Sequence, residues 1–532
     1  MKKISLILSV LVLSFTFTSC SKDFLSTYPT NQEPMAVMLG STAGQLQALN
    51  GIHKMMYSQT NFWSTGNTAV SGARQSAGGL SQMYLTFDHM GEDMVVLAAS
   101  ANWFGTSYDW REHRTVNFAD LQYQFTFLYQ IINNANMLLE NVDDVEDRTA
   151  NEVINRNIRA QALFYRAFAH FYLVQMYGPR FVAGAANDGL AAPLMLQTTI
   201  EPQPQATVAA MYASIIADLE EAIQLFGDFP VTRSGLTAKS HISLPVAYGL
   251  RARVALTQQD WNTAITFAQA TLDNLPTGVR LANANELRDG FSSVNNPDWI
   301  WASYHDASQT TFFIGWGAYA SMNFSSGQIR NHPRGINAVL YNSMDSADIR
   351  RDWWEGRDLD AATRQAEFPT LVAAGFNLPQ FGVRKFRIGG ETSIALNSAM
   401  DLAHMRVSEM YLIIAEANAR AGNTGPAQSA LTTLMEIRVP GFTTANTGDD
   451  LIEEIMTNRR IELWGEGFRF LDLKRTATPL VRTTAQGHRP AVAGPLTMGG
   501  ITHDDPEQAL LWLWVFPQRE TDANPLVNNE GR

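Results

Sequence analysis

Cysteine is almost absent from this 532-residue sequence, which contains only Cys20. A chain with one cysteine cannot form an intramolecular disulfide, so its stability must come from packing. The sequence also has no stretch approaching the roughly eighteen consecutive apolar residues that a membrane-spanning helix needs. We therefore expect a body that sits beside a membrane and does not cross it.

Positive charge is scarce as well. Lys and Arg total 39 against 51 Asp and Glu, which gives a formal net charge of −12. Removing Lys2 and Lys3 with a cleaved leader subtracts two more positive charges and makes the mature part −14. Because this charge repels a phosphate backbone, we expect no nucleic-acid partner.

Signatures of common catalytic sites are missing. The chain has no H-E-x-x-H, G-x-S-x-G, Walker or G-x-G-x-x-G motif, and its histidines lack metal-ligand spacing. Carboxylate pairs such as Glu92 with Asp93, or Asp298 with Asp306, could in principle hydrolyse glycosides, since only their separation in space identifies such a pair. Surface acids are far commoner than catalytic ones, so we expect no enzyme activity, no cofactor and no metal.

The N-terminal residues have the pattern of a bacterial lipoprotein signal. Lys2 and Lys3 precede an apolar run over residues 4–17, and small residues then lead into Cys20. We predict a signal peptide at 1–19, lipidation of Cys20, and a lipidated N-terminus with a tether over 20–40. Two or more acyl chains would anchor the protein stably. An ordinary cleaved signal followed by an accidental cysteine is the alternative.

Three amphipathic helices are predicted from apolar residues that recur at steps of three and four. They cover residues 118–141, 154–177 and 207–226. Gly178 and Pro179 should end the second helix, and the first two helices should pack antiparallel.

Two distant segments share one spacing. Their matching positions at offsets of zero, four, eight and sixteen are Tyr248, Ala252, Leu256 and Ala264, and Tyr411, Ala415, Ala419 and Ala427. In both segments the first helix should end at about the same offset, at 259–260 in one and at 422–423 in the other. The spacing predicts tetratricopeptide-like helix hairpins. A generic amphipathic hairpin would explain the apolar stripes but not the shared alanines.

Between these repeats the helical period fades, and residues 277–400 read as an insertion rich in aromatic side chains. Trp299 and Trp301 alternate with other residues as a half-buried strand would, and we expect them in the core. Trp316 stands between glycines, which is typical of a loop.

A charged tract near the C-terminus could bind an anionic ligand or could pair internally. Its charges stand three or four residues apart, so we expect pairing along one helix and its cap. The residues concerned are Arg459, Arg460, Glu462, Glu466, Arg469 and Asp472.

Four features carry a family resemblance. Two are the lipoprotein-signal motif that ends at Cys20 and the helix over 159–177 with its Gly-Pro end. The other two are the stretches RRIELWGEGFRFLDLKR at 459–475 and FPQRETDANP at 516–525. On these motifs the chain resembles the SusD/RagB-type nutrient-binding outer-membrane lipoproteins of Bacteroidetes over nearly its whole length. The resemblance implies a mostly α-helical, tetratricopeptide-like superhelical body, a SusC-like TonB-dependent transporter as partner, and an outer-membrane, outward-facing location. On this basis 41–532 is one body, with repeats mainly in 41–276 and 401–475 and a variable insertion at 277–400.

Glycan capture needs flat apolar ring faces beside amide or charged groups. The loops over 99–114 and 312–330 offer both, and the resemblance implies an aromatic platform in these two regions. Our candidate ligand-binding residues are Trp103, Trp316, Tyr319, Asn102, Asn323, Arg330 and Trp63. Any of these tryptophans could instead belong to the core.

The sequence as a whole thus predicts a lipid-anchored protein that captures oligosaccharide or polysaccharide and delivers it to the transporter without transforming it. Two alternatives are capture of a peptide or glycopeptide, and a structural lid for the transporter with little ligand affinity of its own.

Overall fold

A computed structural model describes residues 38–57, 77–97, 102–235, 237–306, 308, 315–389, 393–488, 502–503 and 505–532. Cys20 and Trp63 lie outside these residues. The structure is mostly helical, and none of its described helices is long and apolar enough to cross a bilayer.

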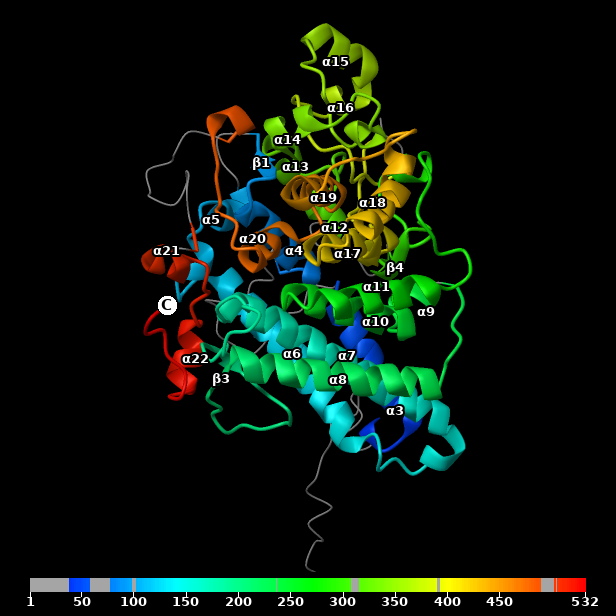
Figure 1. Cartoon of the computed structure of the whole chain (residues 1–532), viewed down its shortest axis with the longest axis vertical. Helices are drawn as coiled ribbons and strands as arrows, with labels where there is room; N and C mark the ends of the chain where they lie inside the picture. Colours follow the sequence, from blue (N-terminus) through cyan, green and yellow to red (C-terminus); the bar gives the residue numbers. More distant parts are fainter. Residues whose placement is uncertain are drawn as a thin grey trace, which may run out of the picture.

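Long helices packed in succession form the body (Figure 1). Along the chain, α7 packs between α6 and α8, α10 pairs with α11, and α17 contacts α11, α18 and α19. The bounds of these helices are α3 Thr42–Met55, α6 Ala119–Asn141, α7 Glu152–Tyr177, α8 Val208–Asp228, α10 Leu244–Thr257, α11 Trp261–Asp273, α17 Val407–Arg420, α18 Thr424–Arg438 and α19 Gly448–Glu462.

Short elements fill the rest of the described chain. They are η2 Asn102–Phe104, α5 Gly105–Tyr108, η3 Glu112–Arg114, η4 Arg148–Asn151, α9 Thr237–Ser240, η5 Glu286–Arg288, α12 Trp316–Ala320, α13 Gly327–Asn331, α14 Ala338–Ser343, η6 Ile349–Trp353, α15 Ala361–Glu367, α16 Pro369–Ala373, α20 Arg469–Arg475, η7 Thr484–Gln486, α21 Pro506–Leu511 and α22 Gln518–Ala523. Among the described residues of 277–400 there are only such short elements and two strands, and α15 and α16 protrude from the body at the top of Figure 1.

The three amphipathic helices form where their apolar stripes predict them. The first helix, α6, begins one residue later than expected, and its predicted inward positions Leu121, Phe125 and Leu128 are buried. For α8, the Thr207 hydroxyl accepts a hydrogen bond from the amide of Ala210 and caps the N-terminus.

The two segments with shared spacing are both helix hairpins, α10 with α11 and α17 with α18. Their four alanines at offsets four and sixteen are fully buried, which lets the paired helices approach closely. The hairpins turn at equivalent residues, Gln259 and Gly422, and both adopt a positive φ, of 63° and 82°. Glycine suits this conformation, whereas Gln259 holds it with a side chain that accepts a hydrogen bond from the amide of Ala183.

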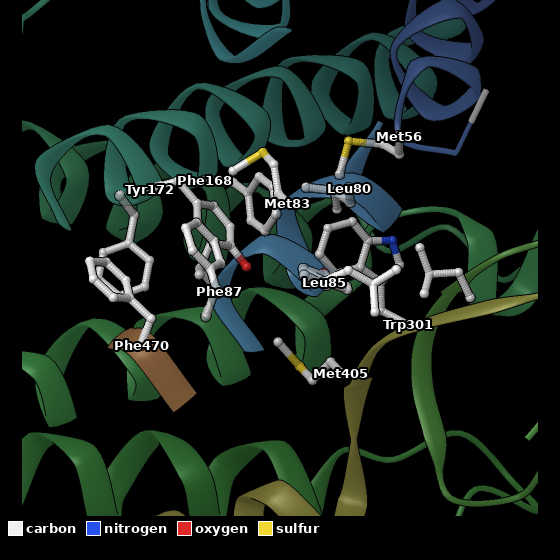
Figure 2. Packing of buried hydrophobic residues seen from close by; sticks show 14 of the residues in the cluster. Met56, Leu80, Met83, Leu85, Phe87, Phe168, Tyr172, Trp301, Met405 and Phe470 are labelled. Carbon is white, nitrogen blue, oxygen red and sulfur yellow. The ribbon is translucent and has the colours of Figure 1, made fainter. Parts of the chain in front are cut away.

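Helix α4, Leu80–Met90, is the buried centre of the molecule and was not expected from the sequence. All of its residues are buried, so it shows no apolar stripe to find. Its side chains face Phe168 and Tyr172 on one side and Trp301 and Met405 on the other (Figure 2). The Phe87 ring stacks on Tyr172, with ring centroids 6.0 Å apart.

The described strands form three antiparallel pairs. They are β1 Met94–Val96 with β5 Arg334–Ile336, β2 Leu190–Pro193 with β3 Gln205–Thr207, and β4 Trp299–Ser303 with β6 Leu402–Arg406. Trp299 and Trp301 are in the core as predicted. The half-buried character was wrong, because every residue of β4 is buried.

A buried ion cluster joins the insertion to the helical body. Glu462, at the end of α19, accepts hydrogen bonds from Arg350 (3.3 Å), Arg406 (3.1 Å) and Arg438 (2.8 Å). We define the cluster by its eight buried members, four cations and four anions: Arg350, Lys385, Arg406, Arg438, Asp298, Asp348, Glu462 and Glu466.

The charged tract is therefore structural, as expected, but its expected local pairing was wrong. Glu466 bonds to Lys385 and Arg406, Arg460 bonds to Asp93, and Arg459 bonds to Asp472 thirteen residues away. Three- and four-residue spacing describes neighbours on a straight helix, whereas this chain turns after Glu462 and faces other elements.

Replacing Glu462 with glutamine should destabilise the protein by about 3–5 kcal/mol, because three buried guanidinium groups lose their shared carboxylate. Burial alone would raise the pKa of Glu462, but Arg438, Arg406 and Arg350 outweigh it and hold that pKa well below the ordinary value. The carboxylate's contribution is thus complete above about pH 5 and is lost as pH falls below about 4. Urea unfolding across pH measures this.

The matched control is Glu367→Gln, which breaks an exposed pair with Arg357 and should change stability by less than about 1 kcal/mol. Equal effects of the two substitutions would contradict the role given to the cluster.

Candidate ligand-binding face

The ends of several chain segments meet around α12. The segments concerned are 58–76, 98–101, 309–314 and 390–392, which lie outside the described residues. Leu80 donates its amide to the carbonyl of Met56 (2.9 Å), so the two ends of the first segment are adjacent. A Cβ on Gly78 would lie 3.1 Å from the Tyr319 hydroxyl oxygen, which places the returning end of this segment directly on α12.

The other segments end at the same place. Trp103, just beyond 98–101, packs edge-to-face on Tyr319 with ring centroids 5.7 Å apart. Asn323 donates its side-chain amide to the carbonyls of Ile388 and Ser393, both at 2.9 Å, and so holds the two ends of 390–392. We call this region the α12 face and define it by Gly78, Trp103, Tyr319 and Asn323. This region includes residues of both loops that the sequence analysis selected, 99–114 and 312–330.

Trp103 is the predicted platform residue that the structure leaves partly exposed. It belongs to η2 and packs against the hydrophobic core with part of its indole. Its neighbour Phe104 is buried and meets Tyr319 edge-to-face at 5.9 Å, which fixes the backbone of η2. A half-buried indole on a rigid support can offer a flat apolar face to a sugar ring.

Trp316 and Tyr319 lie in the core, with 2% and 0% of their surfaces exposed. The Trp316 ring meets Phe386 edge-to-face at 5.3 Å, and Phe386 stacks on Trp464. Neither ring presents a face to a ligand in this structure, so the prediction of Trp316 and Tyr319 as ligand-binding residues is corrected to the alternative, a place in the core. The flanking glycines suggested a loop, but Gly317 serves close packing, since a Cβ there would lie 2.7 Å from the Ser398 carbonyl oxygen.

The polar candidates have different surroundings. Asn323 is fully buried and is occupied in holding backbone. Arg330 is partly exposed and donates to the carbonyls of Ala374 (2.9 Å) and Ser326 (3.3 Å). Asn102 begins η2, beside Trp103.

A second aromatic group, absent from our candidates, lies at the ends of the same segments. Tyr57 directly precedes 58–76, and its ring packs against His305 at 4.6 Å. Tyr304, next to His305, is 37% exposed. Burial, with the carboxylates of Asp306 and Asp401, raises the pKa of Tyr57. The signal available in the sequence was the position of Tyr304 just after the Trp299–Ser303 strand, where the chain leaves the core.

Phe104 packs against a buried arginine, Arg334, which is in turn bonded to His89. Arg334 lies over the Phe104 ring and donates through Nε to His89 Nε2 at 3.0 Å. That acceptor role requires a neutral His89, whose Nδ1 then donates to the carbonyl of Leu85. Burial and the Arg334 charge keep the pKa of His89 well below its ordinary value, and burial lowers the pKa of Arg334 to about 9.

Three of the four conceivable catalytic carboxylates are engaged in ion pairs, and the fourth, Asp306, accepts hydrogen bonds from Ser308. Glu92 accepts from Arg469, and Asp93 accepts from Arg460 at 2.6 Å. Burial would raise the pKa of Asp93, but Arg460 and Arg469 lower it. Asp298 belongs to the ion cluster. In the described part of the chain no group of three His, Cys, Asp or Glu residues could hold a metal ion.

Comparison with known proteins identifies relatives over most of the chain. A family model described as starch-binding and associating with the outer membrane matches residues 53–256, and a model described as the SusD family, SusD_RagB, matches residues 316–531. SusD-like protein P2 of Formosa agariphila is 25% identical over 374 residues, which are 65% of this chain and 70% of that protein.

Solved structures share the fold. A SusD-like carbohydrate binding protein from Bacteroides vulgatus superposes with a TM-score of 0.73 at 24% identity, covering 92% of this chain and 97% of that one. Surface glycan-binding protein A from Bacteroides thetaiotaomicron, solved with laminarihexaose, gives 0.66 at 18% identity, covering 92% and 99%.

Alanine substitutions should separate the two tryptophans by stability. Trp316→Ala removes a buried indole and should cost about 3–5 kcal/mol of unfolding free energy. Trp103→Ala removes a partly exposed indole and one edge-to-face contact, and should cost about 1–2 kcal/mol. Urea midpoints measure both, and a larger loss for Trp103 would place that residue in the core.

Proposed function

The chain belongs to the SusD/RagB family, and from this membership we propose that it captures oligosaccharide or polysaccharide at the cell surface and delivers it to a SusC-like TonB-dependent transporter. It does so without chemical change to the glycan. The fold is that of SusD-like glycan-binding proteins, and the family is associated with the outer membrane.

The observation that carries the proposal is the α12 face. Four chain segments begin or end there, and Trp103 stands at its edge with part of its ring open to solvent. Loops held by a rigid scaffold are the usual carriers of ligand-binding side chains. Because α12 contacts the fully buried helix α4, this face rests directly on the core of the described body.

Glycan chemistry fits this arrangement. The apolar C–H face of a sugar ring packs on an aromatic ring, while hydroxyl groups bind amide or charged side chains. Trp103 supplies the ring, and we propose that Asn102 and Arg330, with Trp63, supply further contacts. That a protein of the same fold was solved with laminarihexaose supports a glucan among the first ligands to try.

The non-catalytic part of the proposal is supported by the pairing of acids. Glu92, Asp93 and Asp298 each bond to a buried or half-buried arginine. Glycoside hydrolysis uses two carboxyl groups that flank the scissile bond, whereas each of these three acids is paired with an arginine.

Isothermal titration of the mature protein in detergent against laminarihexaose and a panel of neutral, acidic and host-type oligosaccharides tests ligand capture. We expect micromolar-to-millimolar binding to at least one glycan, reduced at least about fivefold by Trp103→Ala, since stacking on an aromatic side chain contributes about 1 kcal/mol or more.

The matched control is Trp261→Ala. Trp261 is also a half-buried tryptophan, but it lies on α11 under Arg420, away from α12. Binding lost equally in both variants would argue against a site at Trp103. No binding across the panel, with the transporter still co-purifying, would favour a lid with little ligand affinity.

Lipid anchoring at Cys20 is tested by localisation. Cys20→Ala removes the thiol that would be acylated, so we expect the protein to shift from the membrane fraction to the soluble fraction, since it then lacks the acyl chains. Immunoblots of both fractions measure this, and unchanged membrane association would contradict the proposed anchor.

A further inference from the structure

A groove of about 460 Å³ lies between α6, the β2–β3 connection and α22. These elements neighbour one another at the lower left of Figure 1. None of the lining residues belongs to η2, α12 or α13. The volume is within the range of about 300–1,000 Å³ in which proteins hold small ligands.

The floor of the groove is a polar stripe along α6. Gln122, Thr126, Gln130 and Asn133 follow one another at steps of four, four and three, so they share one helical face. All four are at least partly exposed. Within the described residues, no side-chain hydrogen bond engages the amides of Gln122 and Gln130, which leaves donors and acceptors directed at the groove.

The walls are held in place by hydrogen bonds. From α6, the Tyr129 hydroxyl donates to the carbonyl of Pro193 (2.7 Å) and the Asn136 amide donates to that of Met195 (3.2 Å). From the end of α22, Asn524 donates to the carbonyl of Gln203 (2.9 Å). The groove therefore keeps its form without a ligand, which lowers the cost of binding.

The rim is aliphatic. Ile200 is 98% exposed, and Met195, Pro202 and Ala523 line the groove beside it. Phe125, the phenyl ring in the lining, is buried, and the Tyr129 hydroxyl is engaged. The described lining thus offers mainly side-chain amides and aliphatic surface, and its one partly exposed aromatic ring, Tyr129, is tied by its hydroxyl to the groove wall.

We propose that this groove is a second ligand site and that it binds a free, extended peptide with uncharged side chains. Each glutamine amide presents one donor group and one acceptor, which match the carbonyl and amide of a peptide unit. The aliphatic rim receives apolar side chains. The lining has two carboxylates, Glu201 and Glu520, and one guanidinium, Arg519, so it gives no strong preference for a charged ligand.

The length of the stripe sets the length of the ligand. Gln122 and Asn133 are eleven positions apart, and at about 1.5 Å per residue they span about 16 Å of helix. Extended chain covers that distance with about five residues, at roughly 3.3 Å each. Pentapeptides are therefore the shortest ligands that use the whole stripe.

The test is titration of the mature protein in detergent with an equimolar pool of N-acetylated, C-amidated pentapeptides built from alanine, serine, threonine, valine and leucine. We expect micromolar-to-millimolar binding. The double substitution Gln122→Ala with Gln130→Ala should weaken it at least about tenfold, because two hydrogen-bonding amides are removed. Gln130→Trp, which fills the groove, should do the same.

The matched control is Gln269→Ala on α11, where an exposed amide bonds only to its neighbour Asp273 among the described residues. It should leave peptide binding unchanged, and so should Trp103→Ala. Circular dichroism melts establish that each variant is folded.

Three results of the peptide titration would overturn the proposal. They are no binding of the pool to the unmodified protein, binding unaffected by both groove variants, and binding abolished by Trp103→Ala, which would place the peptide on the α12 face. Loss of laminarihexaose binding in the groove variants, with Trp103→Ala unaffected, would also overturn it, because the groove would then be a sugar site.

Discussion

The balance of buried charge around Glu462 constrains the rest of the molecule. Four cations and four anions lie out of water, and such groups are tolerated only when each has its partner in good geometry. Asp298, Asp348, Arg350 and Lys385 come from the 277–400 interval, and Arg406, Arg438, Glu462 and Glu466 come from the helical body. The insertion and the body must therefore dock in one register, and the α12 face inherits its shape from that register.

The helical part of the fold was largely predictable, because its signal is local. The limits of α6 and α7 and the N-cap of α8 fall within two residues of their predicted positions, and the turns at Gln259 and Gly422 are where the shared spacing puts them. Helix α4 was not predictable by the same reasoning, since a helix covered on every side has no polar face. The partners of the charged tract were equally hidden, because Arg460 finds Asp93 across 367 positions of sequence.

The candidate site was predictable in location and not in detail. Sequence indicated two aromatic loops, and the structure brings both onto Tyr319. Which rings stay open depends on what covers them from elsewhere, and Phe386, far from Trp316 in sequence, covers that indole. The groove along α6 escaped notice because its residues read as the ordinary solvent side of an amphipathic helix. Only the β2–β3 connection and α22, placed opposite, turn that side into a cavity.

The backbone hydrogen bond between Leu80 and Met56 has an evolutionary consequence. It ties together the two ends of the nineteen residues numbered 58–76, so the rest of the protein experiences this stretch as a closed loop. Closing a loop of twice the length costs only about 0.6 kcal/mol more. Changes in the length of that stretch are thus inexpensive for the folding of α3 and α4. Evolution can lengthen or shorten it while the helical scaffold keeps its form.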